Sequence, residues 1–215
     1  MIDWSRTDAI VFDMDGTLWD AVDSYCEIWN RCFAMFDTDL RIHRPELLAC
    51  MGMPLDEIYR RLTAGRIVPD ASAFLPAVER EEAQMMSKLG GRPYPGMQEG
   101  IRRLSESYPV FLLSNCGVSG LADMMRFTGI TPYVREAITF GATQRRKSEN
   151  LRWLKKKYGF MQPVYVGDTE GDCQETHLAG LPFVYASYGF GTCSDADLAV
   201  DTFQEIVDYF LNLKR

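Results

Sequence analysis

The sequence lacks the residue patterns of several large protein classes. Its six cysteines include no Cys-x-x-Cys pair, which argues against a structural zinc site and against a disulfide framework. No apolar stretch approaches the length of a membrane span, and the N-terminus lacks the charged-then-apolar layout of a signal peptide. We therefore expect a cytoplasmic protein with reduced thiols and no membrane partner.

Histidine and positive charge are also scarce. The two histidines, His43 and His177, leave acid–base and metal chemistry mainly to carboxylates. The 23 Lys+Arg and 30 Asp+Glu residues give a net charge of -7, which disfavours a nucleic-acid partner because affinity for phosphate backbones depends on clustered cations. With 215 residues, 47% of them hydrophobic, the chain can bury a core as one domain, or as one domain with a smaller insertion.

Two aspartates follow a short apolar run near the N-terminus. Residues 9–12 predict a buried strand that ends at Asp13. Residues two apart in a strand point the same way, so Asp13 and Asp15 can place both carboxylates on one side. Gly16 then permits a sharp turn, and Thr17 offers a hydroxyl where the chain leaves the strand. Because Asp-Gly is also common in ordinary turns, this stretch needs support from other segments.

Helical patterns dominate the next part of the chain. Apolar residues recur at helical spacing over 22–36, 55–62 and 74–89, and the last pattern ends at two glycines. No convincing strand pattern lies between residues 19 and 91. We therefore predict that 19–91 is an all-helical unit inserted after the first strand.

Strands and helices alternate through the rest of the chain. We expect strands over 110–113, 137–140, 164–166, 183–186 and 198–200, and helices over 97–107, 117–127, 148–158, up to about 180, and from 203. This alternation is typical of a parallel sheet with helices on both faces, which the first strand must join. The predicted fold is a Rossmann-like, doubly wound α/β domain formed by residues 1–18 and 92–215, with a helical cap domain at 19–91.

Polar residues follow three of the predicted strands and open one helix. In such a sheet, ligands bind outside the carboxyl ends of the strands. The residues at this edge are Asp13, Asp15, Ser114, Asn115, Lys147, Asp168 and Asp172. Each alone has an ordinary explanation as a turn, loop or exposed residue, but their joint placement indicates an active site.

The chemistry that fits these residues is phosphoryl transfer through a covalent aspartyl intermediate. Mg²⁺ prefers oxygen ligands, which suits Asp13, Asp168 and a backbone carbonyl, and it would offset the repulsion between carboxylate and phosphate. A protonated Asp15 would give its proton to the leaving oxygen and then accept one from the attacking water. Lys147 supplies a compact positive charge, and the Ser114 hydroxyl can hold phosphate oxygens.

The same residues resemble the motifs of the haloacid dehalogenase-like superfamily, in particular its phosphoglycolate phosphatase-like branch with an α-helical cap. The resemblance covers nearly the whole chain: residues 13–18 resemble the first motif, 114–115 the second, Lys147 the third and 167–172 the fourth. One departure is Ser148, because the family often has proline after the lysine. We expect Ser148 to cap the helix instead.

The resemblance implies a role for each site residue. Asp13 would be the nucleophile and Asp15 the acid–base, with Mg²⁺ held by Asp13, the Asp15 carbonyl oxygen and Asp168. Asp172 would support the metal through water or hydrogen bonding. The phosphate would be held by Ser114, Asn115 and Lys147. The predicted function is Mg²⁺-dependent hydrolysis of a small phosphorylated metabolite by a monomer or homodimer.

Three alternatives stay open at this point. A phosphomutase would use the same core residues and differ mainly in the cap. A phosphonate-cleaving enzyme would need a cap lysine, and Lys88 is the only lysine between residues 19 and 91. A non-catalytic phospholigand-binding protein on the same fold would have lost a motif acid, and all four are present.

Substrate selection, redox chemistry and movement are further hypotheses. Acidic substrates could meet the cap residues Arg41, His43, Arg44, Arg60, Arg61 and Arg66. An apolar pocket could include Trp19, Trp29, Met51 and Met53. Oxidation of Cys116 or Cys173 could affect activity, since both fall inside the catalytic loops. Hinges for cap closure are expected near residues 18–20 and 92–96.

Overall fold

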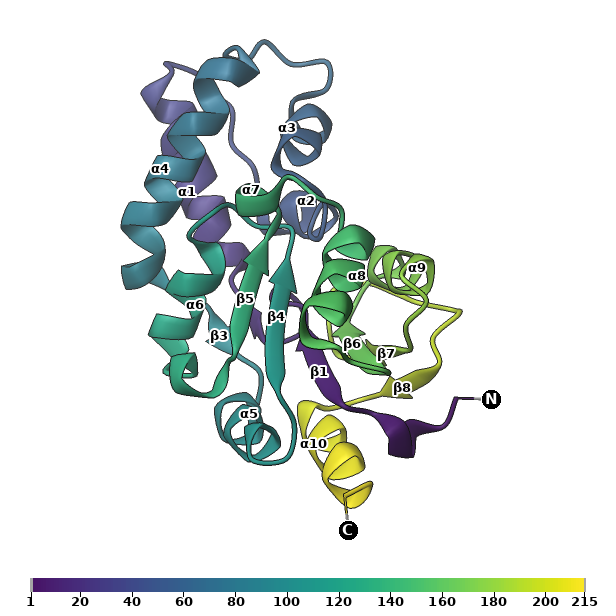
Figure 1. Ribbon diagram of the computed structural model, residues 1–215. Coiled ribbons are helices and arrows are strands. Elements are labelled where there is room, and N and C mark those ends of the chain that lie inside the picture. The colour runs from purple at the N-terminus through teal and green to yellow at the C-terminus, as the bar shows by residue number, and fades with distance from the viewer. Residues whose placement is uncertain (1, 215) are drawn as a thin grey trace.

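A six-stranded sheet forms the centre of the computed structural model, which describes residues 2–214 (Figure 1). The strand order is β5-β4-β1-β6-β7-β8, and every neighbouring pair is parallel. The strands are β1 (Ala9–Phe12), β4 (Val110–Ser114), β5 (Glu136–Thr139), β6 (Pro163–Gly167), β7 (Phe183–Ala186) and β8 (Leu198–Val200). The predicted α/β fold with a parallel sheet is confirmed.

Strand β1 lies in the middle of this sheet and is buried on both faces. Ile10 is in register with Val110 of β4 on one side and with Val164 of β6 on the other. An uninterrupted apolar run suits such a strand, because helices cover both sides of a parallel sheet. Strands β4 and β5 extend away from one edge of β1, and β6 to β8 from the other. The carboxyl end of β1 is therefore at a topological switch point, where sheets of this kind bind ligands.

Five helices pack against the two faces of the sheet. Helices α8 (Lys147–Tyr158) and α9 (Glu170–Leu178) pack on the face that includes Val11. Helices α5 (Met97–Ser105) and α10 (Phe203–Asn212) cover the face that includes Ile10 and Phe12. Helix α6 (Gly120–Thr128) lies beside β5 (Figure 1). Alternation along the strand places Asp13 on the same side as Val11, toward α8 and α9.

Four more helices form a helical unit at one end of the molecule (Figure 1). They are α1 (Val22–Met35), α2 (Arg44–Leu48), α3 (Leu55–Thr63) and α4 (Ala71–Leu89). Their shared core contains stacked rings of Phe33 and Phe74, with centroids 4.5 Å apart, and the edge of Trp29 against Phe74. Helix α4 also packs against α6, which links the helical unit to the sheet side of the molecule.

A two-stranded antiparallel ribbon was not expected from the sequence. Strand β2 (Trp19–Asp20) pairs with β3 (Arg92–Pro93), so the chain enters and leaves the helical unit through neighbouring strands. The expectation of no strand after residue 19 is wrong at Trp19–Asp20, because two residues are too few to produce an alternating pattern. The ribbon lies beside the boundaries proposed near residues 18 and 92, and that division into domains stays a prediction.

Several helix boundaries also differ from the sequence-based expectations. The short helix α2 was not predicted, α4 starts at Ala71 behind the Asp70 cap, and α6 starts at Gly120 rather than near 117. Strand β5 ends at Thr139, whose hydroxyl accepts from the Ala142 N–H and starts α7 (Phe140–Thr143). The remaining short elements are the 3₁₀ turns η1 (Trp4–Arg6) and η2 (Thr131–Tyr133). None of the helices in residues 2–214 is long and apolar enough to cross a membrane.

Candidate active site

Asp13 lies directly after β1 and is almost fully buried. Its backbone N–H donates to the Val166 carbonyl at 2.8 Å, which keeps the residue in line with the sheet. Its Oδ1 accepts from Lys147 Nζ at 2.7 Å and from Tyr165 Oη at 3.2 Å. Within residues 2–214, Asp13 Oδ2 accepts no hydrogen bond. One carboxylate oxygen is therefore held in place while the other accepts no hydrogen bond from the described residues, and Asp13 lines the cavity described below.

Lys147 bridges two buried carboxylates. It is the first residue of α8, and its Nζ lies 2.7 Å from Asp13 Oδ1 and 2.5 Å from Asp172 Oδ1. Burial alone would lower the pKa of Lys147, but the two carboxylates raise it well above its ordinary value. The lysine is therefore a fixed positive charge. The expectation that Ser148 caps α8 is wrong: the Arg146 N–H donates to Glu149 Oε2 and the Ser148 N–H to Glu175 Oε2, so acidic side chains satisfy the helix start.

Asp172 is held by the start of α9 as well as by the lysine. Its Oδ2 accepts from the Thr169 N–H at 3.1 Å and from Thr169 Oγ1 at 2.7 Å, while Thr169 Oγ1 accepts from the Asp172 N–H. This reciprocal capping box provides hydrogen-bond partners for backbone N–H groups at the start of α9. Both Asp172 oxygens are therefore occupied, one by Thr169 and one by Lys147.

Asp168 follows β6 and lies against the turn that follows Asp13. Its Oδ2 accepts from the Phe190 N–H at 2.7 Å, and its Oδ1 from Thr17 Oγ1 at 3.4 Å. Gly16 has φ +83°, and a Cβ at this position would lie 2.1 Å from Asp168 Oδ2. Only glycine suits this position, because the backbone conformation is left-handed and the Asp168 carboxylate fills the space.

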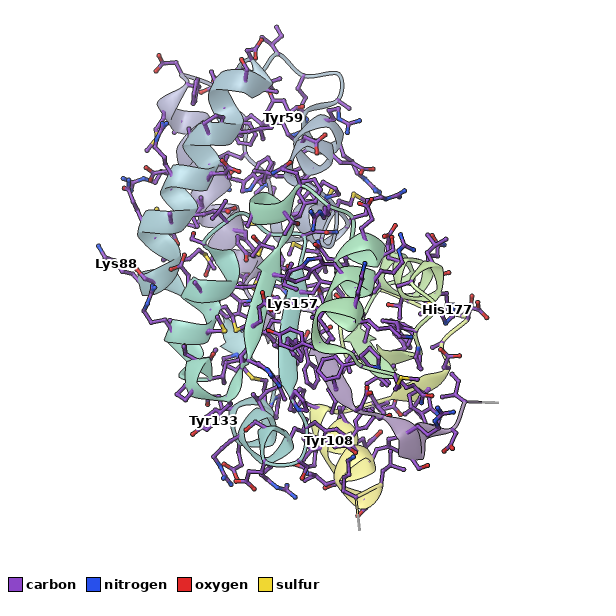
Figure 2. All side chains as sticks on the ribbon, in the orientation of Figure 1. Tyr59, Lys88, Tyr108, Tyr133, Lys157 and His177 are labelled. Atoms are coloured by element: carbon purple, nitrogen blue, oxygen red, sulfur yellow. The ribbon has the colours of Figure 1, made fainter. Side chains whose placement is uncertain are left out.

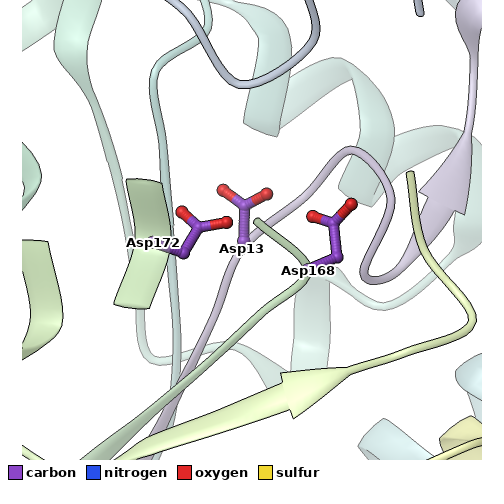
Figure 3. Close-up of side chains that lie close together, drawn as sticks. All are labelled: Asp13, Asp168 and Asp172. Carbon is purple, nitrogen blue, oxygen red and sulfur yellow. The ribbon is translucent and has the colours of Figure 1, made fainter. Parts of the chain in front are cut away.

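The carboxylates of Asp13, Asp168 and Asp172 converge on one buried space (Figure 3). One oxygen from each lies within 4.8 Å of the other two. Burial raises the pKa of Asp13 to about 6, and burial with the neighbouring aspartates raises the pKa of Asp168 well above its ordinary value. Several carboxylates at such short range repel one another, so a bound cation would relieve the repulsion. The donor set is all oxygen, which fits Mg²⁺ better than zinc or copper.

Asp15 lies apart from the Lys147 group. Its Oδ1 accepts from Trp19 Nε1 at 2.9 Å, and its Oδ2 from Tyr25 Oη at 3.5 Å. Burial, together with the negative charge of Asp13, raises the pKa of Asp15 well above its ordinary value. The two aspartates of the opening motif therefore have different surroundings. Asp13 contacts a cation, whereas Asp15 contacts neutral donors and retains a proton more readily.

The two residues after β4 behave differently from each other. Ser114 is buried, and its hydroxyl accepts from the Cys116 N–H at 3.3 Å. Asn115 Nδ2 donates to the Gly52 carbonyl at 2.8 Å, in the loop between α2 and α3. Asn115 therefore connects the sheet edge to the helical unit, a contact that sequence spacing does not indicate.

A cavity of about 260 Å³ opens between this sheet edge and the helical unit. Asp13, Asp15, Ser114 and Lys147 line one side. The other side includes Trp29, Met51 and Met53, whereas Trp19 is buried next to Asp15 and does not line the cavity. The basic cap residues expected to meet an acidic substrate are absent from the described residues that line it. They are Arg41, His43, Arg44, Arg60, Arg61 and Arg66.

Comparison with known proteins agrees with the geometry. The family described as haloacid dehalogenase-like hydrolase matches residues 10–186, a range that includes every site residue expected from the sequence. The chain belongs to this family. The phosphatase relatives described next support a phosphatase-type enzyme.

Relatives of this hydrolase are similar over most of its length. A phosphoglycolate phosphatase from Rhodobacter capsulatus is 27% identical over 200 residues, 85% of each chain. Another from Aliivibrio fischeri is 26% identical over 220 residues, 92% of this chain and 94% of the relative. The crystal structure of a predicted phosphoglycolate phosphatase from Haemophilus somnus superposes with a TM-score of 0.84 at 20% identity, covering 95% of this chain and 98% of that one.

Sequence reasoning missed four contributors to this site. Tyr165 reaches Asp13 from the neighbouring strand, Tyr25 reaches Asp15 from α1, and the Phe190 N–H reaches Asp168 from the loop after β7. Glu82 of α4 lines the cavity. A tyrosine in an otherwise aliphatic strand was the one local signal, since a buried hydroxyl needs a partner. The other three depend on how distant segments fold together.

Proposed function

We propose that this enzyme is a Mg²⁺-dependent phosphatase that hydrolyses a small phosphomonoester through an aspartyl-phosphate at Asp13. The observation that carries the proposal is the contrast between Asp13 and Asp15, which line the same cavity. Asp13 Oδ1 is fixed by Lys147 while its Oδ2 has no partner within residues 2–214, and Asp15 accepts from Trp19. These surroundings suit a nucleophile and a proton donor respectively.

The first step uses both aspartates. Asp13 Oδ2 attacks the phosphorus atom, and the bond between phosphorus and the ester oxygen breaks. Protonated Asp15 donates its proton to that oxygen, so the product leaves as a neutral alcohol. In the second step, water attacks the phosphorus, Asp15 accepts the water proton, and the bond between phosphorus and Asp13 breaks. Inorganic phosphate is released and both aspartates return to their starting states.

Mg²⁺ would be held by Asp13, Asp168 and the Asp15 carbonyl oxygen, where it would supply positive charge to the phosphate oxygens. Lys147 adds a second positive charge at a fixed position, and Ser114 offers a hydroxyl from the same side of the cavity. Because both Asp172 oxygens are already engaged, we assign Asp172 the role of positioning Lys147 and of contributing negative charge to the metal site.

The alternatives have less support. A mutase acting on a bisphosphate would need a second phosphate site, and Lys147 is the only lysine or arginine among the described residues lining the cavity. A phosphonate-cleaving mechanism would need Lys88 in the site, but this side chain projects from the outer edge of α4 (Figure 2) and does not line the cavity. A non-catalytic protein would not need the proton-donor environment of Asp15.

The test is phosphate release from p-nitrophenyl phosphate with Mg²⁺ and with EDTA. Asp13→Asn should reduce turnover by about a thousandfold or more, because an amide cannot replace the nucleophile. Asp208→Asn is the matched control, since Asp208 is exposed on α10, away from the cavity. Substantial turnover by Asp13→Asn, or full activity in EDTA, would contradict the mechanism. The names of the relatives make phosphoglycolate the first physiological ester to assay.

A further inference from the structure

Helix α4 turns two glutamates toward the cavity. Glu79, Glu82, Ala83 and Met86 line it at positions three or four residues apart, which places them on one face of the helix. The neighbouring Glu81 does not line the cavity and pairs with Arg31 at 2.8 Å. Within this stripe Met86 is buried and Glu82 is half-buried, whereas Glu79 and Ala83 are exposed, so Glu82 is the glutamate of this face that is partly removed from water.

Glu82 lies near the groups that carry out the reaction. Its Oε2 is 4.0 Å from the position that a Cβ on Gly117 would occupy, in the loop that follows Ser114. The negative charge of Glu82 contributes to the raised pKa values of Asp15 and Tyr25. The Glu82 carboxylate therefore lies beside the loop that follows Ser114 and lines the same cavity as Asp13 and Asp15, which a bound ester would occupy.

The Glu82 carboxylate also lacks a protein partner. Within residues 2–214 it accepts no hydrogen bond and forms no ion pair, and burial with the charge of Glu79 raises its pKa to about 7. Of the other lining acids away from the Lys147 group, Glu79 is exposed and Asp123 of α6 is paired with Arg126 at 2.9 Å. Glu82 is half-buried, and even partial removal of an unpaired carboxylate from water is costly, so a ligand cation would offset that cost.

The cavity offers no equivalent place for a second anion. Lys147 is the only basic residue among its described lining residues, and its ammonium group already donates hydrogen bonds to Asp13 and Asp172. A substrate carboxylate would face Glu82 and Glu79 with no cation free to receive it. Like charges in a site of low dielectric constant disfavour binding.

The rest of the lining suits a short apolar chain that ends in a cation. Met51, Met53 and Ile58 provide aliphatic surface, and the aromatic residues Tyr25 and Trp29 line the same cavity. Aromatic faces attract ammonium groups, most strongly where water is excluded. The volume of about 260 Å³ limits the ligand to a small molecule.

We propose that the substrate is a phosphomonoester of a short amino alcohol, with Glu82 receiving the ammonium group while the phosphate lies at Asp13 and Lys147. The inference rests on the proposed phosphatase function and narrows its substrate class. Esters that carry a carboxylate, such as phosphoglycolate, are disfavoured by the same glutamate.

The test compares kcat/KM for three esters of similar size: 2-aminoethyl phosphate, 2-hydroxyethyl phosphate and phosphoglycolate. The wild-type enzyme should prefer the amino ester to phosphoglycolate by at least tenfold. Glu82→Gln should reduce this ratio by about tenfold, and Glu82→Asp, which keeps the charge, should retain the preference. The matched control is Glu81→Gln on the same helix, which should leave the ratio unchanged because Glu81 faces Arg31.

The outcomes separate this inference from the function on which it rests. If p-nitrophenyl phosphate is hydrolysed and Asp13→Asn is inactive, but phosphoglycolate is preferred by the wild type, the role of Glu82 is overturned and the phosphatase mechanism stands. If Glu82→Gln and Glu81→Gln change the ratio equally, the assignment to Glu82 also fails. If no ester is hydrolysed, both proposals are overturned. If a Glu82 variant does not fold, the ratio of wild-type kcat/KM values for 2-aminoethyl phosphate and phosphoglycolate still tests the proposed substrate class.

Discussion

Lys147 and Asp172 form a buried ion pair, with Nζ and Oδ1 2.5 Å apart and side chains 4% and 3% exposed. Asp172 is fixed by the capping box of α9, and Lys147 is the first residue of α8, so the pair joins the starts of two helices on one face of the sheet. The lysine ammonium group is thereby aimed at Asp13. The capping box at the start of α9 therefore also fixes the position of the Lys147 ammonium group beside Asp13.

Replacing Asp172 should weaken both the fold and the reaction. Asp172→Asn leaves Lys147 with one carboxylate partner, and breaking a buried pair costs about 3–5 kcal/mol when no partner remains. Because Asp13 remains, we expect a loss of about 2 kcal/mol of unfolding free energy in urea, with a further fall in kcat. Asp201→Asn, at an exposed position, serves as the control. Unchanged stability would show that the pair does not hold the two helices.

Gly16→Ala should weaken Mg²⁺-dependent activity through steric conflict with the proposed metal site. The added Cβ would lie 2.1 Å from Asp168 Oδ2, so the carboxylate must move. We expect the Mg²⁺ concentration for half-maximal activity to rise by at least tenfold. Gly65→Ala is a matched control, because Gly65 also has positive φ but a Cβ there meets nothing within 4 Å. That variant should lose only about 1 kcal/mol of stability and keep its Mg²⁺ requirement.

Asn115→Ala separates two roles for this residue. If Asn115 mainly holds the Gly52 carbonyl, the variant loses one hydrogen bond of about 1 kcal/mol, and hydrogen exchange in the loop over 51–53 should quicken. The value of kcat/KM should fall by less than about tenfold. Direct binding of the transition-state phosphate predicts a loss above a hundredfold. Gln98→Ala provides the control, since Gln98 Nε2 donates to the Thr128 carbonyl, remote from the cavity.

Glu82 makes stability depend on pH in a defined direction. Its pKa is raised from 4.5 to about 7 in the folded protein, so between these values the folded state binds more protons than the unfolded state. Stability therefore falls as pH rises from about 4.5 to 7, and the loss is complete above that range. Glu82→Gln should remove this loss and raise Tm at pH 8, by about 4–8 °C if the loss is about 2 kcal/mol. At pH 4.5 the variant and the wild type should differ little. An equal change in Tm at both pH values would contradict a raised Glu82 pKa.

The sequence predicts the sheet and its acidic edge because both depend on local patterns. Apolar runs such as residues 9–12 mark buried strands, and the polar residues that follow them must meet at one edge of a parallel sheet. Tyr25 and Glu82 could not be assigned in this way. Their positions depend on the direction in which helices α1 and α4 face the sheet edge, and spacing within a helix identifies a face without identifying its neighbour.

The β2–β3 ribbon has a consequence for the timing of proton transfer. Trp19, which donates to the Asp15 carboxylate, is part of β2, and β2 is one of the two strands through which the chain enters and leaves the helical unit. Tyr25, which also donates to the Asp15 carboxylate, belongs to α1, so a rotation of that unit about the ribbon would carry its hydroxyl away from Asp15 while Trp19 stayed in place, and would change the acidity of the carboxyl group. Opening of the cavity to the substrate and the pKa of the proton donor Asp15 would then change together.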